Sequence, residues 1–178
     1  NYGAFTGSVS ASMLKNMGAE YIILGHSENR IEGDTNPTIK KKIRSSINRK
    51  LNVIFCIGET YKEKKMGKTF FTLRKQIKES IEKKFNLDKI IIAYEPVWSI
   101  GSNKIPKITE LKKIIEFIKK DFKKILKTSK EPKVLYGGSV NPENIRLFSS
   151  SSEIDGFLIG GASQSSKKFI DIIKNYYK

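Results

Sequence analysis

The chain has 178 residues, with 34 lysines and arginines against 18 aspartates and glutamates, so its formal net charge is +16. This length predicts one domain, and a hydrophobic content of 38% excludes a disordered or collagen-like chain. One cysteine excludes an internal disulfide, and a single histidine excludes a Cys/His zinc cluster. We therefore expect no metal site and a reducing, cytoplasmic location.

The apolar stretches are too short for a membrane protein. None approaches the roughly 18 uncharged residues of a membrane span, and the start of the chain lacks the basic and apolar regions of a signal peptide. We expect a soluble protein with no membrane partner.

The strong positive charge raises the question of a nucleic-acid partner. Only five of the basic residues are arginines, although arginine dominates phosphate and base recognition. The lysines alternate with apolar residues at helical spacing, which is typical of solvated helix faces. We expect no nucleic-acid partner, and a basic polyanion-binding module is kept as an alternative.

Short apolar runs alternate with helix-like segments along the chain. The runs are continuous rather than alternating, as in strands covered on both faces. The predicted strands are 21–24, 53–57, 90–94, 133–136 and 156–159. The predicted helices are 10–17, 37–50, 68–85, 109–127, 142–149 and 165–177, and Thr109 is the expected N-cap of the longest.

A β-α pattern repeated five times predicts a parallel sheet with helices on its faces. Both an open doubly wound sheet and the eight-stranded barrel of about 250 residues have this pattern. The first option lacks its usual GxGxxG signature here. In either architecture ligands bind beyond the carboxyl ends of the strands, where this chain carries His26, Glu28, Glu95 and several Gly-rich turns.

The residues at these strand ends resemble the triosephosphate isomerase family, in family order and spacing. The resemblance is carried by GAFTG at 3–7, YIILGHSENR at 21–30, FCIGE at 55–59, AYEPVWSIGS at 93–102, LYGGSVNPEN at 135–144 and DGFLIGGAS at 155–163. It implies an α/β fold, the (β/α)8 TIM barrel. Residues 1–178 would form a single partial barrel domain with about five of eight β/α units, from the third β/α loop to the C-terminus.

The resemblance also implies a reaction. Members interconvert dihydroxyacetone phosphate and D-glyceraldehyde 3-phosphate through an enediol(ate), without cofactor or metal, in glycolysis and gluconeogenesis. Glu95 matches the general base, His26 the neutral imidazole that polarises the carbonyl, and Glu28 a carboxylate that organises the catalytic cluster. Without the resemblance, His26 is interpreted as a structural residue and Glu28 as a helix N-terminal acid. Cys56 matches a packing cysteine near the site.

Two further groups of residues are implied by the resemblance. Backbone N–H groups expected to hold the substrate phosphate belong to Gly101, Ser139, Gly160 and Gly161. The expected mobile lid comprises Pro96, Val97, Trp98, Ser99, Ile100, Gly101 and Ser102 and extends to about residue 107. In the closed family lid, a tyrosine matching Tyr136 bonds a backbone N–H at the second hinge, but Pro106 has none to offer.

The sequence also departs from the family. Nothing matches the Asn-x-Lys motif of the first strand, and the sequence begins with Asn1 rather than Met, so we expect missing upstream sequence. The 178 residues alone are expected to be inactive as an isomerase. A homodimer is expected for the complete protein through the loop at 3–7, although the charges usual at the positions of Ser8 and Asn29 are both absent.

The sequence is compatible with two further interpretations. In one, the chain is a non-catalytic truncated remnant of the family. In the second, it is a different phosphate-binding barrel isomerase, which would share the Gly-rich turns but would not explain GHSE together with YEPVW.

Overall fold

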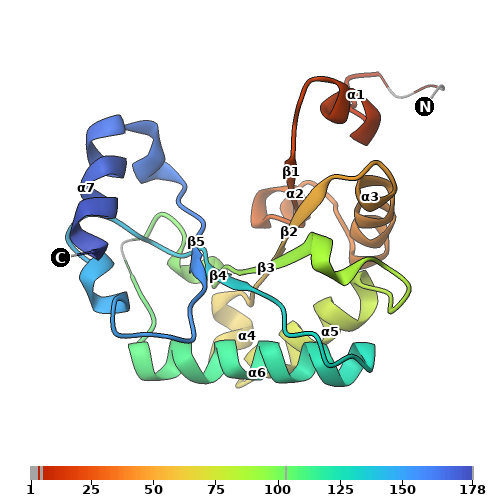
Figure 1. Cartoon of the computed structure of the whole chain (residues 1–178). Coiled ribbons are helices and arrows are strands. Elements are labelled where there is room, and N and C mark those ends of the chain that lie inside the picture. The colour runs from red at the N-terminus through yellow and green to blue at the C-terminus, as the bar shows by residue number, and fades with distance from the viewer. Residues whose placement is uncertain (1–3, 5, 103, 178) are drawn as a thin grey trace.

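A computed structural model describes residues 4, 6–102 and 104–177, and its centre is a five-stranded parallel sheet (Figure 1). Neighbouring strands follow one another in chain order. The strands are β1 (Tyr21–Leu24), β2 (Asn52–Ile57), β3 (Ile90–Tyr94), β4 (Val134–Tyr136) and β5 (Gly156–Phe157). Parallel pairing brings all five carboxyl ends to one edge of the sheet.

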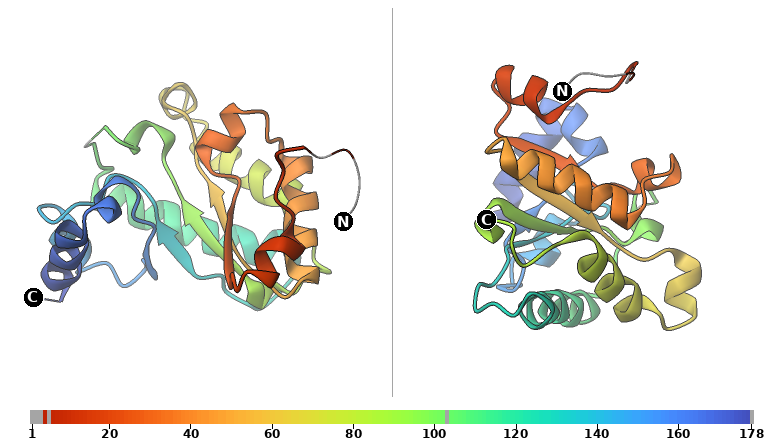
Figure 2. Two further views of the ribbon diagram at one scale, coloured as in Figure 1. Left: turned by 90° about the horizontal axis from the view of Figure 1, so that it is seen from above. Right: turned by 90° about the vertical axis from the view of Figure 1, so that its right-hand side faces the viewer.

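Helices connect successive strands, as the alternating pattern predicted. The α-helices are α1 (Ala11–Asn16), α2 (Ser27–Ile31), α3 (Asn36–Asn48), α4 (Tyr61–Lys65), α5 (Thr69–Ser80), α6 (Ile108–Leu126) and α7 (Ser166–Tyr176). Short 3-10 helices are η1 (Leu87–Lys89), η2 (Val97–Ser99), η3 (Ile145–Phe148) and η4 (Gly161–Gln164). α3 packs on α5 and α5 on α6, while α7 lies at the other end of the sheet, beside η3 and η4 (Figures 1 and 2).

The two faces of the sheet differ in how well they are covered. Alternate residues such as Val53, Phe55 and Ile92 lie in the core, fully buried. On the opposite face, Ile23, Ile54 and Ile91 lie side by side on β1, β2 and β3. This row is apolar but only partly covered by other residues, and Ile23 is 45% exposed. Farther along the same face Cys56 and Ala93 are fully buried, so among the described residues the prediction of strands buried on both faces fails only at this row.

The long helix α6 supplies much of the core. Its predicted apolar stripe is buried at Leu111, Ile114, Ile115, Ile118 and Phe122. The prediction of Thr109 as N-cap was wrong: the helix begins at Ile108, and Lys107 precedes it without a side-chain cap. The backbone N–H groups of Glu110 and Leu111 already donate to the Lys107 carbonyl, so Thr109 lies inside the first turn and not at the capping position.

Three predicted elements are clearly shorter than expected. The helix predicted at 68–85 ends at Ser80, where Ile81 turns to an extended conformation. The helix predicted at 142–149 is only the 3-10 turn η3, and the strand predicted at 156–159 ends at Phe157. Asn141 Oδ1 accepts hydrogen bonds from the backbone N–H groups of Glu143 and Asn144, which gives this segment a turn in place of a helix.

The short helices α2 and α4 were missed, and each begins at a side-chain cap. Thr60 forms a reciprocal capping box with Glu63 at the start of α4, whereas His26 caps α2. Within the part of the chain that the structure describes, no helix combines the length and the apolar character needed to cross a membrane.

Helices α5 and α6 are joined by a salt bridge whose acid is buried. Arg74 donates two hydrogen bonds to Asp121, at 2.9 and 3.0 Å, and the Asp121 side chain is only 6% exposed. We predict that Arg74→Met, which leaves this carboxylate unpaired, lowers the free energy of unfolding by about 1–2 kcal/mol in urea titrations.

The matched control removes a salt bridge that is exposed to solvent. Lys130 bonds Asp88, and both side chains are more than half exposed, so Lys130→Met should cost less than about 1 kcal/mol. Adding Asp121→Asn to Arg74→Met should restore part of the lost stability. Equal effects of the lysine and arginine substitutions would contradict this account.

Candidate active site

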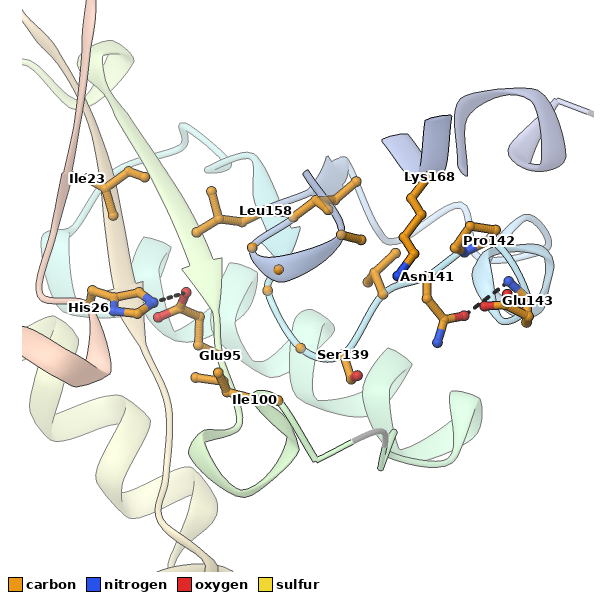
Figure 3. Close-up of a pocket in the computed structure, with 18 residues that line it drawn as sticks. Ile23, His26, Glu95, Ile100, Ser139, Asn141, Pro142, Glu143, Leu158 and Lys168 are labelled. Atoms are coloured by element: carbon orange, nitrogen blue, oxygen red, sulfur yellow. Dashed lines mark hydrogen bonds and ion pairs between the residues drawn. The ribbon is translucent and has the colours of Figure 1, made fainter. Parts of the chain in front are cut away.

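A pocket of about 470 Å³ lies at the edge of the sheet where the strands end (Figure 3). Seven of the residues that the sequence predicted for the site line this one pocket: His26, Glu95, Ile100, Gly101, Ser139, Gly160 and Gly161. They come from loops after β1, β3, β4 and β5. The parallel topology therefore brings together residues that lie far apart in the sequence, from His26 to Gly161.

Glu95 is the buried acid of the pocket. Its side chain is 5% exposed, and its Oε2 atom has no hydrogen-bond partner within the described ranges. Burial raises the pKa of Glu95, and the neighbouring His26, the Cys56 thiol and the Arg30 guanidinium offset only part of this effect. A carboxylate that is desolvated and incompletely bonded is a stronger base than one in water, which suits it to proton abstraction.

His26 faces Glu95 across the pocket. Its Nε2 atom lies 3.5 Å from Glu95 Oε1, and the two side chains turn toward one another (Figure 3). The backbone N–H of Glu28 donates to His26 Nδ1 at 3.4 Å, at the first turn of α2. An acceptor Nδ1 carries no proton, so the ring in this arrangement is neutral and carries its proton on Nε2, toward the pocket.

Glu28 does not join the pocket. Its side chain is 82% exposed, and Oε2 lies 3.7 Å from His26 Nδ1, on the side of the ring away from Glu95. Its place in the first turn of α2 matches the helix N-terminal acid considered from sequence.

Close backbone contacts fix the position of Glu95. A Cβ atom at Gly58 would lie 1.8 Å from the Glu95 carbonyl oxygen, and one at Gly137 would lie 2.7 Å from Glu95 Cγ. Gln76 from α5 bonds both the N–H and the C=O of Gly58, at 2.9 and 3.0 Å. Gln76 was not predicted, because a polar residue on a helix carries no sign of which loop it reaches.

The start of the predicted lid is anchored by Glu59, a fully buried acid next to the site. It accepts a hydrogen bond from Trp98 Nε1 at 2.8 Å and another from the Tyr94 hydroxyl at 3.1 Å. Burial raises the pKa of Glu59, and these hydrogen bonds offset part of the shift. The Lys64 ammonium lies 3.9 Å from the centre of the Trp98 ring. The sequence showed Glu59 at a strand end but gave it no role.

The predicted lid is only partly in contact with the pocket. Of the lid residues, Ile100 and Gly101 line the pocket. Ser99 is fully buried and does not line it, and Ser102 is exposed to solvent. Lys168 of α7 lines the pocket as well, although the sequence did not suggest it. Burial raises the pKa of Cys56, which therefore stays a packing thiol.

The burial of Glu95 predicts a pH-dependent stability. Because the pKa of Glu95 is raised on folding, the folded state holds this proton more tightly, and stability falls as the pH rises from the unfolded pKa through the folded one. Glu95→Gln removes that penalty. We expect it to raise the midpoint of thermal unfolding at about pH 7.5 by roughly 2–4 °C, with a difference that shrinks toward about pH 4.

Calorimetry of both proteins across this pH range is the measurement. Glu28→Gln is the control, because Glu28 is exposed and its removal should leave the midpoint nearly unchanged. A wild-type protein more stable than Glu95→Gln at every pH would contradict the assignment of Glu95 as a destabilised buried acid.

Comparison with known proteins places this geometry in a family. The family model described as "Triosephosphate isomerase" matches residues 1–176. The chain is 44% identical to the triosephosphate isomerase of Dictyoglomus thermophilum over 178 residues, an alignment that covers 97% of this chain and 72% of that protein. It is 42% identical to that of Thermodesulfovibrio yellowstonii, covering 98% and 72% of the two chains.

A solved structure shows the same fold. The crystal structure of the triosephosphate isomerase from Bartonella henselae superposes with a TM-score of 0.89 at 34% identity, and the match covers 99% of this chain and 73% of that one. The expected incomplete β/α barrel is thereby confirmed.

Proposed function

The chain belongs to the triosephosphate isomerase family, and we propose on this basis that its pocket interconverts dihydroxyacetone phosphate and D-glyceraldehyde 3-phosphate in glycolysis and gluconeogenesis. The observation that carries the proposal is the pair of a buried, incompletely bonded carboxylate and an imidazole 3.5 Å apart. This pair opens into a pocket lined by Gly-rich loops.

Glu95 is the proposed base. Its carboxylate takes a proton from the substrate carbon beside the carbonyl and returns it to the neighbouring carbon. The C–H electron pair forms the C=C bond of an enediolate, and the carbonyl oxygen gains the negative charge. His26 donates Nε2–H to that oxygen, which stabilises the charge as it develops. The neutral ring inferred from the Glu28 N–H contact supports this role.

The phosphate group is proposed to bind at the far side of the same pocket. Backbone N–H groups of Gly101, Ser139, Gly160 and Gly161 are the proposed donors, supported by their shared place in the lining. The lid at 96–102 would cover the substrate and exclude water, which prevents loss of phosphate from the enediolate. Glu28 is retained as a residue that orients His26 through its backbone.

The remaining parts of the proposal concern the domain and its partners. Residues 1–178 are proposed to form one partial barrel domain, and a homodimer is proposed for the complete protein. Val9, Met13 and Met17 are each more than half exposed in and around α1, which supports an apolar contact there. The loop at 3–7 lies partly outside the described residues. We propose a cytoplasmic location and no nucleic-acid or membrane partner.

The experiment is an isomerase assay of the protein produced from its natural gene. Glu95→Gln should lower kcat by about 10²–10⁴-fold, since the base is lost. Glu28→Gln should lower it far less, because that side chain lies outside the pocket. Wild-type activity in Glu95→Gln would contradict the proposed role.

The 178 residues expressed alone are expected to show no appreciable isomerase activity. They span 72% of the length of the Dictyoglomus thermophilum relative, one face of their sheet is partly uncovered, and no residue matches the lysine of the family's Asn-x-Lys motif. Turnover by these residues that Glu95→Gln abolishes would overturn this expectation.

A further inference from the structure

We infer that the Ser99 hydroxyl is a latch: it ties the two ends of the lid to the phosphate-binding loop and releases that loop when phosphate binds. Ser99 would thus be a positioning residue that couples lid movement to ligand binding. The inference rests on the proposed function only in taking phosphate as the ligand.

The Ser99 hydroxyl is fully buried and fully bonded. Its oxygen lies 2.5 Å from the carbonyl oxygen of Lys104, 3.2 Å from the Tyr136 hydroxyl and 3.4 Å from the backbone nitrogen of Ser139. A serine has one proton to donate and two lone pairs. The carbonyl of Lys104 can only accept, so Ser99 donates to it and accepts from both Tyr136 and Ser139.

This arrangement joins the two ends of the lid. Ser99 lies in η2 at the start of the lid and Lys104 lies near its end, so one short hydrogen bond spans the loop. Pro106 offers no N–H at the second hinge, and here the Tyr136 hydroxyl bonds Ser99. Burial raises the pKa of Tyr136 to about 12, so this hydroxyl keeps the proton that it donates.

The third contact reaches the phosphate-binding loop. The N–H of Ser139, a proposed phosphate donor, points to Ser99 Oγ at 3.4 Å. A Cβ atom at Gly138 would lie 2.0 Å from the Tyr136 hydroxyl and 2.8 Å from Ser99 Oγ, so the loop is held tightly against this cluster. A phosphate oxygen that takes the Ser139 N–H removes one bond from Ser99, which loosens the latch.

Because the bond between Ser139 and Ser99 must break before phosphate takes the Ser139 N–H, this bond should lower the affinity of the protein for phosphate. When only a fraction of molecules has the binding arrangement, the apparent affinity falls by that fraction. Ser99→Ala removes the competing acceptor and frees the Lys104 carbonyl. We expect this variant to bind inorganic phosphate about 3–10-fold more tightly than wild type, the size of effect expected for one lost hydrogen bond.

The experiment uses the protein produced from its natural gene and labelled with 5-fluorotryptophan, and the signal of Trp98, which lies within the lid, is assigned by its loss in Trp98→Phe. Fluorine NMR then reports the lid directly during titration with inorganic phosphate. Ser99→Ala should shift the ligand-free signal toward the phosphate-bound position, and Tyr136→Phe should produce part of that shift. In the double variant, the two effects should not add.

The matched control is Ser80→Ala, which removes another buried serine hydroxyl on α5 and should leave both the signal and the affinity unchanged. Should Ser99→Ala fail to fold by circular dichroism, Ser99→Cys provides the same test, because a thiol is a weak donor. Unchanged or weaker phosphate binding in the Ser99 variants, or no response of the wild-type signal to phosphate, would overturn the inference.

The activity assay and the phosphate titration distinguish failure of the proposed function from failure of the Ser99 inference. If the natural protein lacks isomerase activity but the Ser99 variants change phosphate binding as expected, the latch stands and the reaction is wrong. If the activity is present but the Ser99 variants bind like wild type, the latch alone is wrong.

Discussion

The burial of the Glu95 carboxylate at the end of β3 is the constraint on which the site depends. The backbone N–H of Glu95 donates to the Ile57 carbonyl, so hydrogen bonding between β2 and β3 fixes the position of Glu95 at the edge of the sheet. Gly58 and Gly137, which directly follow the neighbouring strands β2 and β4, lie against the backbone and side chain of Glu95 and restrict its sideways movement. The structure thus keeps an acid in a position where ionisation is costly, and that cost is the source of its basicity.

The groups around the site stabilise the buried carboxylates of Glu95 and Glu59 to different extents. Arg30 donates to the carbonyls of Gly25 and Cys56, at 2.7 and 3.1 Å, and so joins the ends of β1 and β2. A second acid buried near the site, Glu59, is bonded to Trp98 and Tyr94 at the start of the lid. Glu59 and Glu95 therefore differ by their partners: Glu59 is satisfied and structural, and Glu95 is left available for chemistry.

Much of the fold and site could be predicted from the sequence, because local patterns encode them. Continuous apolar runs identified the strands, and glycines and acids at the strand ends identified the pocket. The segment at 142–149 was misjudged because asparagine side chains compete with the helix. Gln76, Lys168 and the Ser99 contacts depend on how distant segments meet, which no local pattern records. The uncovered row at Ile23 likewise shows only in the folded sheet.

The central claim is that Glu95 is a buried base, and its ionisation can be measured directly. The chain labelled with ¹³C at glutamate side chains would be titrated by NMR, with Glu95→Gln used to assign the carboxyl signal. We predict a pKa for Glu95 above its ordinary value, as burial requires. A carboxyl signal that titrates at or below the ordinary value of an exposed glutamate would contradict the account.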